Sequence, residues 1–168
     1  MEEPNEISQD FYNTVINAAP LYNLICSCGH SGCLIWHGKY TRHVKTGAGK
    51  ITLVVRRVYC TLCCATHALL PSVIVPYSQV PLSDHVAIAS SYESDGNAMK
   101  VLENNPELSP SQVWYILSLY IRCWRQRLVS EHICFYPLHA LTQSCAILFS
   151  RQFMQIKTTK NTLYSPPT

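Results

Sequence analysis

Residues 37–59 carry the pattern of two strands joined by a glycine turn. A polar and aromatic segment runs from His37 to Val44, and Thr46-Gly-Ala-Gly-Lys50 supplies the turn residues. The next segment, Ile51–Tyr59, is rich in valine, isoleucine and threonine, which pack well on a pleated surface. The sequence therefore predicts a β-hairpin here.

After an extended connector, Pro71–Pro81, the spacing of apolar residues becomes helical. Ser83 is expected to cap a helix that is broken at Gly96-Asn97, with Asp84 near its positive end. A short helix is expected over Asn97–Glu103, and Asn104–Leu108 forms the turn that follows. The apolar positions of the first helix are Val86, Ala89 and Tyr92.

The strongest helix start is Ser109-Pro110-Ser111-Gln112, which combines a serine cap, a first-turn proline and a glutamine that can return the capping bond. A buried stripe at three- and four-residue steps comprises Val113, Ile116, Leu117, Tyr120, Ile121, Trp124 and Leu128. The other side carries Ser111, Gln112, Tyr115, Ser118, Arg122 and Arg125. A short helix, a turn and a longer helix form the pattern of a helix-turn-helix, whose second helix can enter a major groove.

Pro137 precedes a last helical stripe, and Asn161–Thr168, with two prolines, is expected to fray. The stripe comprises Leu138, Leu141, Cys145, Leu148, Phe149, Phe153 and Ile156. We therefore expect an α+β fold, in which a small β zinc ribbon precedes a helical helix-turn-helix domain with a C-terminal helix. The expected divisions are 1–20 (N-terminal segment), 21–80 (ribbon and connector), 81–131 (helix-turn-helix) and 132–168 (C-terminal helix and tail).

The nine cysteines indicate what holds the N-terminal half together, since six of them lie between positions 26 and 64. Cys60-Thr-Leu-Cys63 is a C-x-x-C loop, and two such loops on successive hairpins can surround one Zn²⁺ tetrahedrally. We expect one structural Zn²⁺ held by Cys26, Cys28, Cys60 and Cys63. Cys33 is the alternate to Cys26, because the first loop departs from the usual spacing.

Other uses of these side chains rank lower. His30 and His67 are lesser substitutes as ligands, and Cys64 is expected to point away from the metal. A redox dithiol is disfavoured because no helix of adequate length follows Cys63. The isolated thiols are expected to be core residues; they are Cys123, Cys134 and Cys145.

The net charge of +3 hides an uneven distribution, because no Asp or Glu occurs between Phe11 and Ser83. Two basic segments separated by an acidic one are typical of a protein that contacts a polyanion. The chain has no apolar stretch of about 20 residues and no export signal at its acidic N-terminus. A soluble protein of the cytoplasm, associated with the nucleoid and not with a membrane, is therefore expected.

Several segments resemble a family of small uncharacterised proteins of Gram-positive bacteria. They are Cys26-Ser-Cys28-Gly29, His37–Arg42, Arg57-Val-Tyr-Cys60-x-x-Cys63, Leu70–Ser78 and Arg151–Lys157. The ribbon and, loosely, the helices are also similar to the N-terminal DNA-binding regions of insertion-sequence transposases. The resemblance implies DNA recognition connected with mobile elements.

We therefore expect a non-catalytic protein that binds double-stranded DNA, with a second copy of the chain or a transposase as further partners. The expected DNA contacts are Lys39, Arg42, Lys45, Arg56, Arg57, Ser111, Gln112, Tyr115, Arg122 and Arg125. A protein-interaction module is the main alternative, using Trp36, Tyr40, Tyr59 and Tyr77. A transposase-type nuclease is disfavoured, because no predicted strand carries an acid that could hold paired metal ions. The acids available for it are Asp84, Glu93, Asp95, Glu103 and Glu107.

Overall fold

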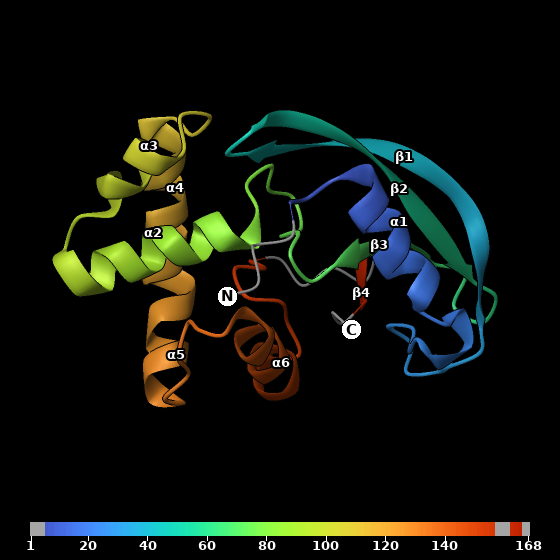
Figure 1. Ribbon diagram of the computed structural model, residues 1–168. Coiled ribbons are helices and arrows are strands. Elements are labelled where there is room, and N and C mark those ends of the chain that lie inside the picture. Colours follow the sequence, from blue (N-terminus) through green and yellow to red (C-terminus); the bar gives the residue numbers. More distant parts are fainter. Residues whose placement is uncertain (1–5, 157–161, 166–168) are drawn as a thin grey trace. The chain divides into compact units, whose positions relative to one another are not determined.

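The computed structural model describes residues 6–156 and 162–165 (Figure 1). The chain forms two compact units, which are treated separately below. The first unit draws on Met1–Val44, Ile51–Ser72 and Thr159–Thr168, and the second on Lys45–Lys50 and Val73–Thr158. Strands dominate the N-terminal half and helices follow, so the expected α+β class is confirmed.

The sheet has the strand order β1-β2-β3-β4. Its strands are β1 (Leu34–Thr46), β2 (Gly49–Cys60), β3 (Thr66–Pro71) and β4 (Thr162–Ser165). Gly47 and Ala48 join β1 to β2, as the sequence predicts, and Gly49 has a φ of +123° that suits glycine alone. β3 runs antiparallel to β2 and pairs His67 with Val58.

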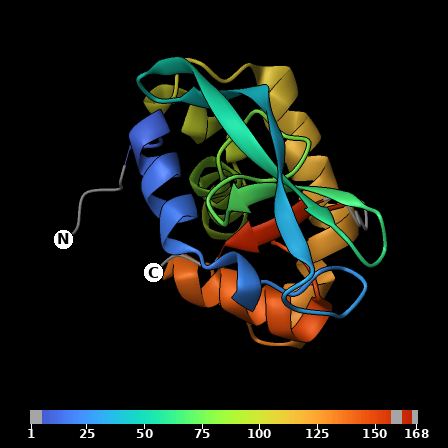
Figure 2. The same ribbon diagram turned by 90° about the vertical axis from the view of Figure 1, so that its right-hand side faces the viewer.

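β4 lies parallel to β3, with Leu163 opposite Leu69, and Figure 2 shows the two strands side by side. The prediction that Asn161–Thr168 frays is therefore wrong for the four residues of this strand; the rest of that segment lies outside the described residues. The partner strand is distant along the chain, so no local pattern announces the pairing.

A helix that the sequence analysis did not predict, α1 (Gln9–Ala18), packs on the sheet (Figure 2). Ser8 caps it by accepting a hydrogen bond from the backbone N–H of Phe11. The fully buried Tyr12 hydroxyl donates to the carbonyl of Leu69 at 3.1 Å and accepts from the N–H of Arg56 at 2.7 Å. One side chain thus fastens α1 to β2 and β3, and a 3₁₀ turn, η1 (Leu21–Asn23), leads on to the first cysteine loop.

In the second unit, α2 (Leu82–Asp95) begins one residue before the expected cap. Pro81 occupies the N-cap position and makes no side-chain capping bond, so the assignment of Ser83 as the cap is wrong. The predicted break is confirmed, since Gly96 ends the helix in the left-handed conformation with φ of +68°.

The following helices agree with the expected short-helix, turn, long-helix order. They are η2 (Ala98–Lys100), α3 (Val101–Asn104), α4 (Pro110–Leu119), η3 (Tyr120–Trp124) and α5 (Arg125–Ser130). Ser109 and Gln112 form the predicted capping box at the start of α4. η3 is a π-helical turn, wider than an α-turn, so three- and four-residue spacing no longer predicts which way a side chain faces. Ile121, expected in the buried stripe, is 41% exposed.

α6 (Leu138–Phe149) confirms the expected C-terminal helix but ends earlier than the apolar stripe, at Ser150 in the left-handed conformation. Leu148, expected in the apolar stripe, is exposed on the helix, while Phe153, beyond the helix, is fully buried. Trp124 and Phe153 meet edge to face with ring centroids 5.4 Å apart, at the centre of a continuous apolar core. Of the isolated thiols, Cys145 is buried and Cys123 partly buried in this core, but Cys134 is exposed, so its placement as a core residue is wrong.

Candidate metal centre

Two loops of the first unit converge at one end of the hairpin. The first loop is closed by a bridge between Ile25 and Ser31, and the second follows the end of β2. The backbone N–H of Thr61 donates to the carbonyl of Cys33 at 2.9 Å, which ties one loop to the other. Cysteines separated along the chain are thereby brought to the same place.

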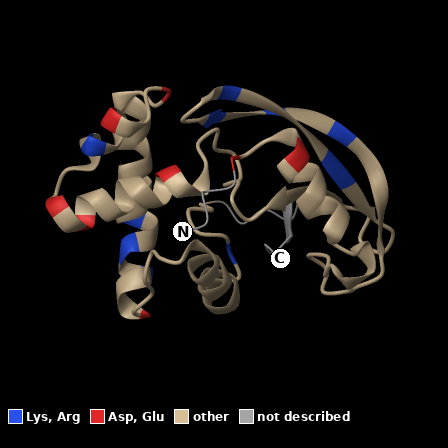
Figure 3. Ribbon diagram, viewed as in Figure 1, with Lys and Arg blue, Asp and Glu red and all other residues tan. Residues whose placement is uncertain are grey.

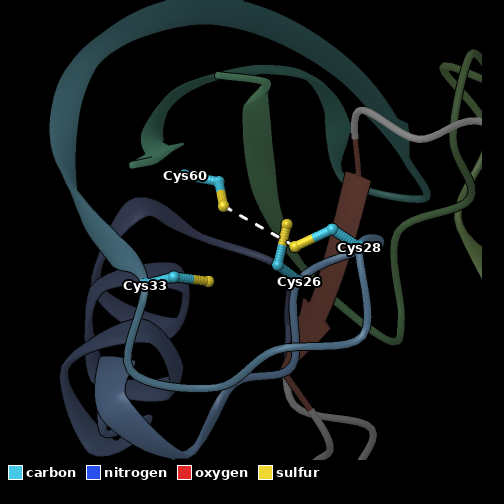
Figure 4. Close-up of side chains that lie close together, drawn as sticks. All are labelled: Cys26, Cys28, Cys33 and Cys60. Carbon is cyan, nitrogen blue, oxygen red and sulfur yellow. Dashed lines mark hydrogen bonds between the residues drawn. The ribbon is translucent and has the colours of Figure 1, made fainter. Parts of the chain in front are cut away.

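Four sulfurs form the first possible ligand group (Figure 4). Cys26, Cys28, Cys33 and Cys60 each offer one Sγ atom, and these atoms all lie within 4.8 Å of one another. The Sγ atoms of Cys28 and Cys60 are 3.8 Å apart. A tetrahedral Zn²⁺ with bonds of about 2.3 Å to sulfur separates its ligands by about 3.8 Å, so this spacing fits such an ion.

A second group shares one member with the first. The Sγ atom of Cys26 lies 3.6 Å from that of Cys63 and 3.2 Å from Nε2 of His67. His67 is completely buried, and its place on β3 directs the imidazole to the sulfurs. From the sequence this histidine ranked low, because a lone histidine is more often a surface or core residue than a ligand. β3 was not predicted, and its strand position is the feature that could have raised the rank of His67.

The two groups together offer six ligand atoms, whereas a tetrahedral ion takes four. Three of the four expected ligands, Cys26, Cys28 and Cys60, belong to the four-sulfur group together with Cys33. The fourth, Cys63, belongs to the second group with Cys26 and His67. His30 and Cys64 are exposed and belong to neither group. Sulfur and imidazole donors without a carboxylate suit Zn²⁺ and other thiophilic cations better than Mg²⁺ or Ca²⁺.

Local hydrogen bonds favour charged sulfur in part of the cluster. The backbone N–H of Cys63 donates to Sγ of Cys60 at 3.4 Å and, with further hydrogen bonds, lowers the pKa of Cys60 to about 6. Burial first, and then the neighbouring sulfurs, Cys60 above all, raise the pKa of Cys33 to about 12, because these sulfurs oppose a second negative charge there. A bound cation would compensate several thiolates at once.

Some of the basic residues expected to contact DNA are exposed, and others are partly buried or held by contacts within the protein. Lys39 and Arg57 are exposed on the hairpin, which carries no acid (Figure 3). The guanidinium of Arg56 donates to Asn17 at 2.7 Å and lies over the Trp36 ring. Arg42 is partly buried on β1. Lys45, in the second unit, donates its ammonium protons to the carbonyl of Glu107 and to Gln112.

The residues at the start of α4 also divide into exposed side chains and side chains held by contacts within the protein. Ser111 and Tyr115 are exposed, and so is Trp114, which the sequence analysis did not select. Gln112 is engaged as a cap, since its Oε1 accepts from the N–H of Ser109 at 3.0 Å. Arg122 is exposed on η3.

Arg125, also expected to contact DNA, is paired with a carboxylate. Its guanidinium donates two hydrogen bonds to Glu93, at 2.6 and 3.1 Å. The other acids considered for a nuclease are similarly dispersed: Asp95 pairs with Lys100, and Asp84 accepts a hydrogen bond from Asn105. Among the residues searched, no carboxylate joins a group that could hold a metal.

Comparison with known proteins gives one match. A family described as a domain of unknown function (DUF6431) matches residues 26–103, which span both cysteine loops, β1 to β3, α2 and most of α3. No curated protein and no solved structure matches the chain. Within the part of the chain that the structure describes, none of the helices has the length and apolar character needed to cross a bilayer.

Proposed function

We propose that this protein binds double-stranded DNA, with α4 reading the major groove and one structural Zn²⁺ holding the sheet unit. The observation that carries the proposal is the outer side of α4. Ser111, Tyr115 and Ser118 recur at steps of four and three residues, opposite the buried Val113 and Leu117. Such a stripe faces away from the core along one side of the helix.

The chemistry of this side fits base recognition. Tyr115 and the neighbouring Trp114 are 64% and 62% exposed, so two large aromatic side chains of this helix are accessible to a ligand. Serine and tyrosine hydroxyls donate and accept hydrogen bonds at base edges or phosphates. The capping box at Ser109 fixes the start of the helix, so these groups are presented in a defined orientation.

The sheet unit supplies charge suited to phosphates. Lys39 and Arg57 are exposed on a hairpin without acids, and phosphate contacts of this kind favour all DNA sequences alike. The cysteine cluster would act structurally, because four protein ligands leave no open position for water. These features support a binding protein in preference to an enzyme, and the resemblance to transposase DNA-binding regions supports an association with mobile elements.

The test is fluorescence anisotropy with the full zinc-loaded chain, a pool of random duplexes and a range of salt concentrations. We expect Tyr115→Ala to reduce by about tenfold the affinity for duplexes that the wild-type chain selects from the pool. The affinity for the unselected random pool should stay almost unchanged. Arg57→Gln should weaken binding to all duplexes alike and reduce the slope of log affinity against log salt concentration by about 1. Gln143→Ala, an exposed change on α6, is the matched control. Failure of the wild-type chain to bind any duplex at low salt would overturn the proposal.

A second candidate, a protein-docking module, is favoured by apolar residues on the cysteine loops. Ile25 and Leu62 flank ligand positions on the two loops and are 64% and 61% exposed. Co-purification with and without nuclease treatment separates the candidates. A partner retained after nuclease treatment and lost in Leu62→Ser supports docking, and a partner lost with the nucleic acid supports DNA binding.

A further inference from the structure

The second unit contains a cavity of about 550 Å³ between the helix formed by η3 and α5 and the segment that follows α6. Three arginines line it: Arg122 on η3, Arg127 on α5 and Arg151 beyond α6. Among the described residues that line it, the one acid is Glu131, so their charged groups sum to +2 (three minus one). Cavities of this volume are the scale at which small ligands bind.

Arg127 lies against two aromatic rings, and no ion pair joins it to a carboxylate of the described residues. Its guanidinium carbon lies 5.6 Å from the centroid of the Trp124 ring and 5.9 Å from that of Phe149. The faces of these rings attract the cation but accept no conventional hydrogen bond from it, and Arg127 is exposed. Arg125, which belongs to the same helix, instead satisfies its donors on Glu93.

The helix places further donors on the side of the cavity. Arg122, Gln126 and Ser130 recur at four-residue steps, and all three line the cavity. The Nε of Arg122 donates to the carbonyl of Ser118 at 3.3 Å, which anchors that side chain along the helix. The π-helical turn that carries Arg122 is a kind of irregularity that often occurs at functional sites.

We propose that this cavity binds a phosphate oxyanion, with Arg127 and Arg151 as its principal ligands. Guanidinium groups present paired N–H donors that match two oxygens of one phosphate, and the cavity is roomy enough for a diphosphate or a phosphodiester. Free phosphate compounds and the DNA backbone present the same chemistry. The site is distinct from the stripe on α4 and stands whether or not that stripe reads bases.

The test is isothermal titration calorimetry of the full zinc-loaded chain with inorganic pyrophosphate at constant ionic strength. We expect saturable binding that weakens at least about tenfold in Arg127→Gln and in Arg151→Gln. Lys50→Gln removes a positive charge from an exposed position on β2, outside the cavity and outside the proposed DNA contacts, and should leave the affinity unchanged. Arg127→Lys keeps the charge but loses the planar pair of donors, so it should fall between wild type and Arg127→Gln.

A duplex oligonucleotide added in competition distinguishes the two sources of phosphate. Displacement of pyrophosphate by the duplex assigns the site to the DNA backbone, and independent binding assigns it to a free phosphate compound; both support the proposal. The absence of saturable binding by the folded wild-type chain would overturn it. An equal loss of affinity in Lys50→Gln would do the same, because it would reveal only general charge attraction. Circular dichroism confirms folding, and Arg151→Gln, which leaves the aromatic stacking intact, decides the matter if Arg127→Gln unfolds.

Discussion

The two units differ in what holds them together. The second unit has a continuous apolar core in which Trp124, Tyr120 and Phe153 are almost fully buried. The first unit buries the residues of one sheet face under α1, and at the end of the hairpin its interior consists of sulfur and imidazole. Burial of apolar area is the main stabilising term in folding, so the second unit can rely on its core, whereas a cation bound by the sulfur cluster would hold the loops of the first.

The largest difference should appear when the metal ligands are lost. Cys26→Ser removes the sulfur shared by both groups, and we expect the apparent stability of the first unit to fall by several kcal/mol, because metal binding contributes directly to folding. Hydrogen exchange should accelerate over β2 and remain slow over α4. Cys134→Ser changes an exposed thiol outside the cluster and is the control. Equal acceleration of hydrogen exchange in both units would contradict the idea that the metal ligands stabilise the first unit alone.

The reverse experiment removes the core of the second unit. Trp124→Ala deletes a side chain that is 1% exposed, and we expect it to cost about 3–5 kcal/mol in free energy of unfolding. Trp114→Ala, at 62% exposure, should cost less than about 0.5 kcal/mol. Denaturant titration measures both, and metal content by mass spectrometry should be unaltered in each. A loss of metal in Trp124→Ala would show that the units are not independent.

A smaller effect is expected where α1 meets the sheet. Burial raises the pKa of Tyr12 to about 12, so its hydroxyl stays protonated and bridges Arg56 and Leu69. Tyr12→Phe leaves a buried N–H and carbonyl without this partner, at a cost of about 1–3 kcal/mol in the unfolding of the metal-loaded protein. Tyr22→Phe alters a side chain that is 71% exposed and should have little effect. If both variants lose equal stability, the bridge is not what fastens α1.

The smallest effect concerns an ion pair of the second unit. Arg125, with the hydroxyl of Tyr120, lowers the pKa of Glu93 below its usual 4.5. A lowered pKa contributes stability above pH 4.5 that is lost as the pH falls through the folded-state value. Glu93→Gln should therefore cost about 1 kcal/mol at pH 7 and less near pH 3, by denaturant titration. Glu103→Gln, an exposed change, is the control, and its effect on the free energy of unfolding should not differ in this way between the two pH values.

Local patterns predicted the elements whose causes are local. The glycine turn at residues 46–50, the break at Gly96 and the capping box at Ser109 were all confirmed, because each depends on neighbouring residues. α1 was not predicted and β4 was predicted to fray. The first is amphipathic but short, and the second forms only beside β3. A strand that owes its existence to a distant partner leaves little trace in its own residues.

The candidate sites show the same limit. Cysteine spacing indicated a thiolate site, but the place of His67 among the sulfurs depends on the register of β3, which spacing does not encode. Likewise, Arg122 and Arg125 are indistinguishable as sequence, yet one lines a cavity and the other is paired with Glu93.

The sequence alone determined the residue types available for chemistry and the turns and caps that start and stop its elements, since these depend on a few adjacent side chains. The tertiary structure decided which groups meet: the cysteine loops with His67, Arg127 with the ring of Phe149, and Arg125 with the carboxylate of Glu93. The physical reason is that these contacts are made across chain separations of tens of residues, where packing, and not local conformational preference, sets the distance between side chains.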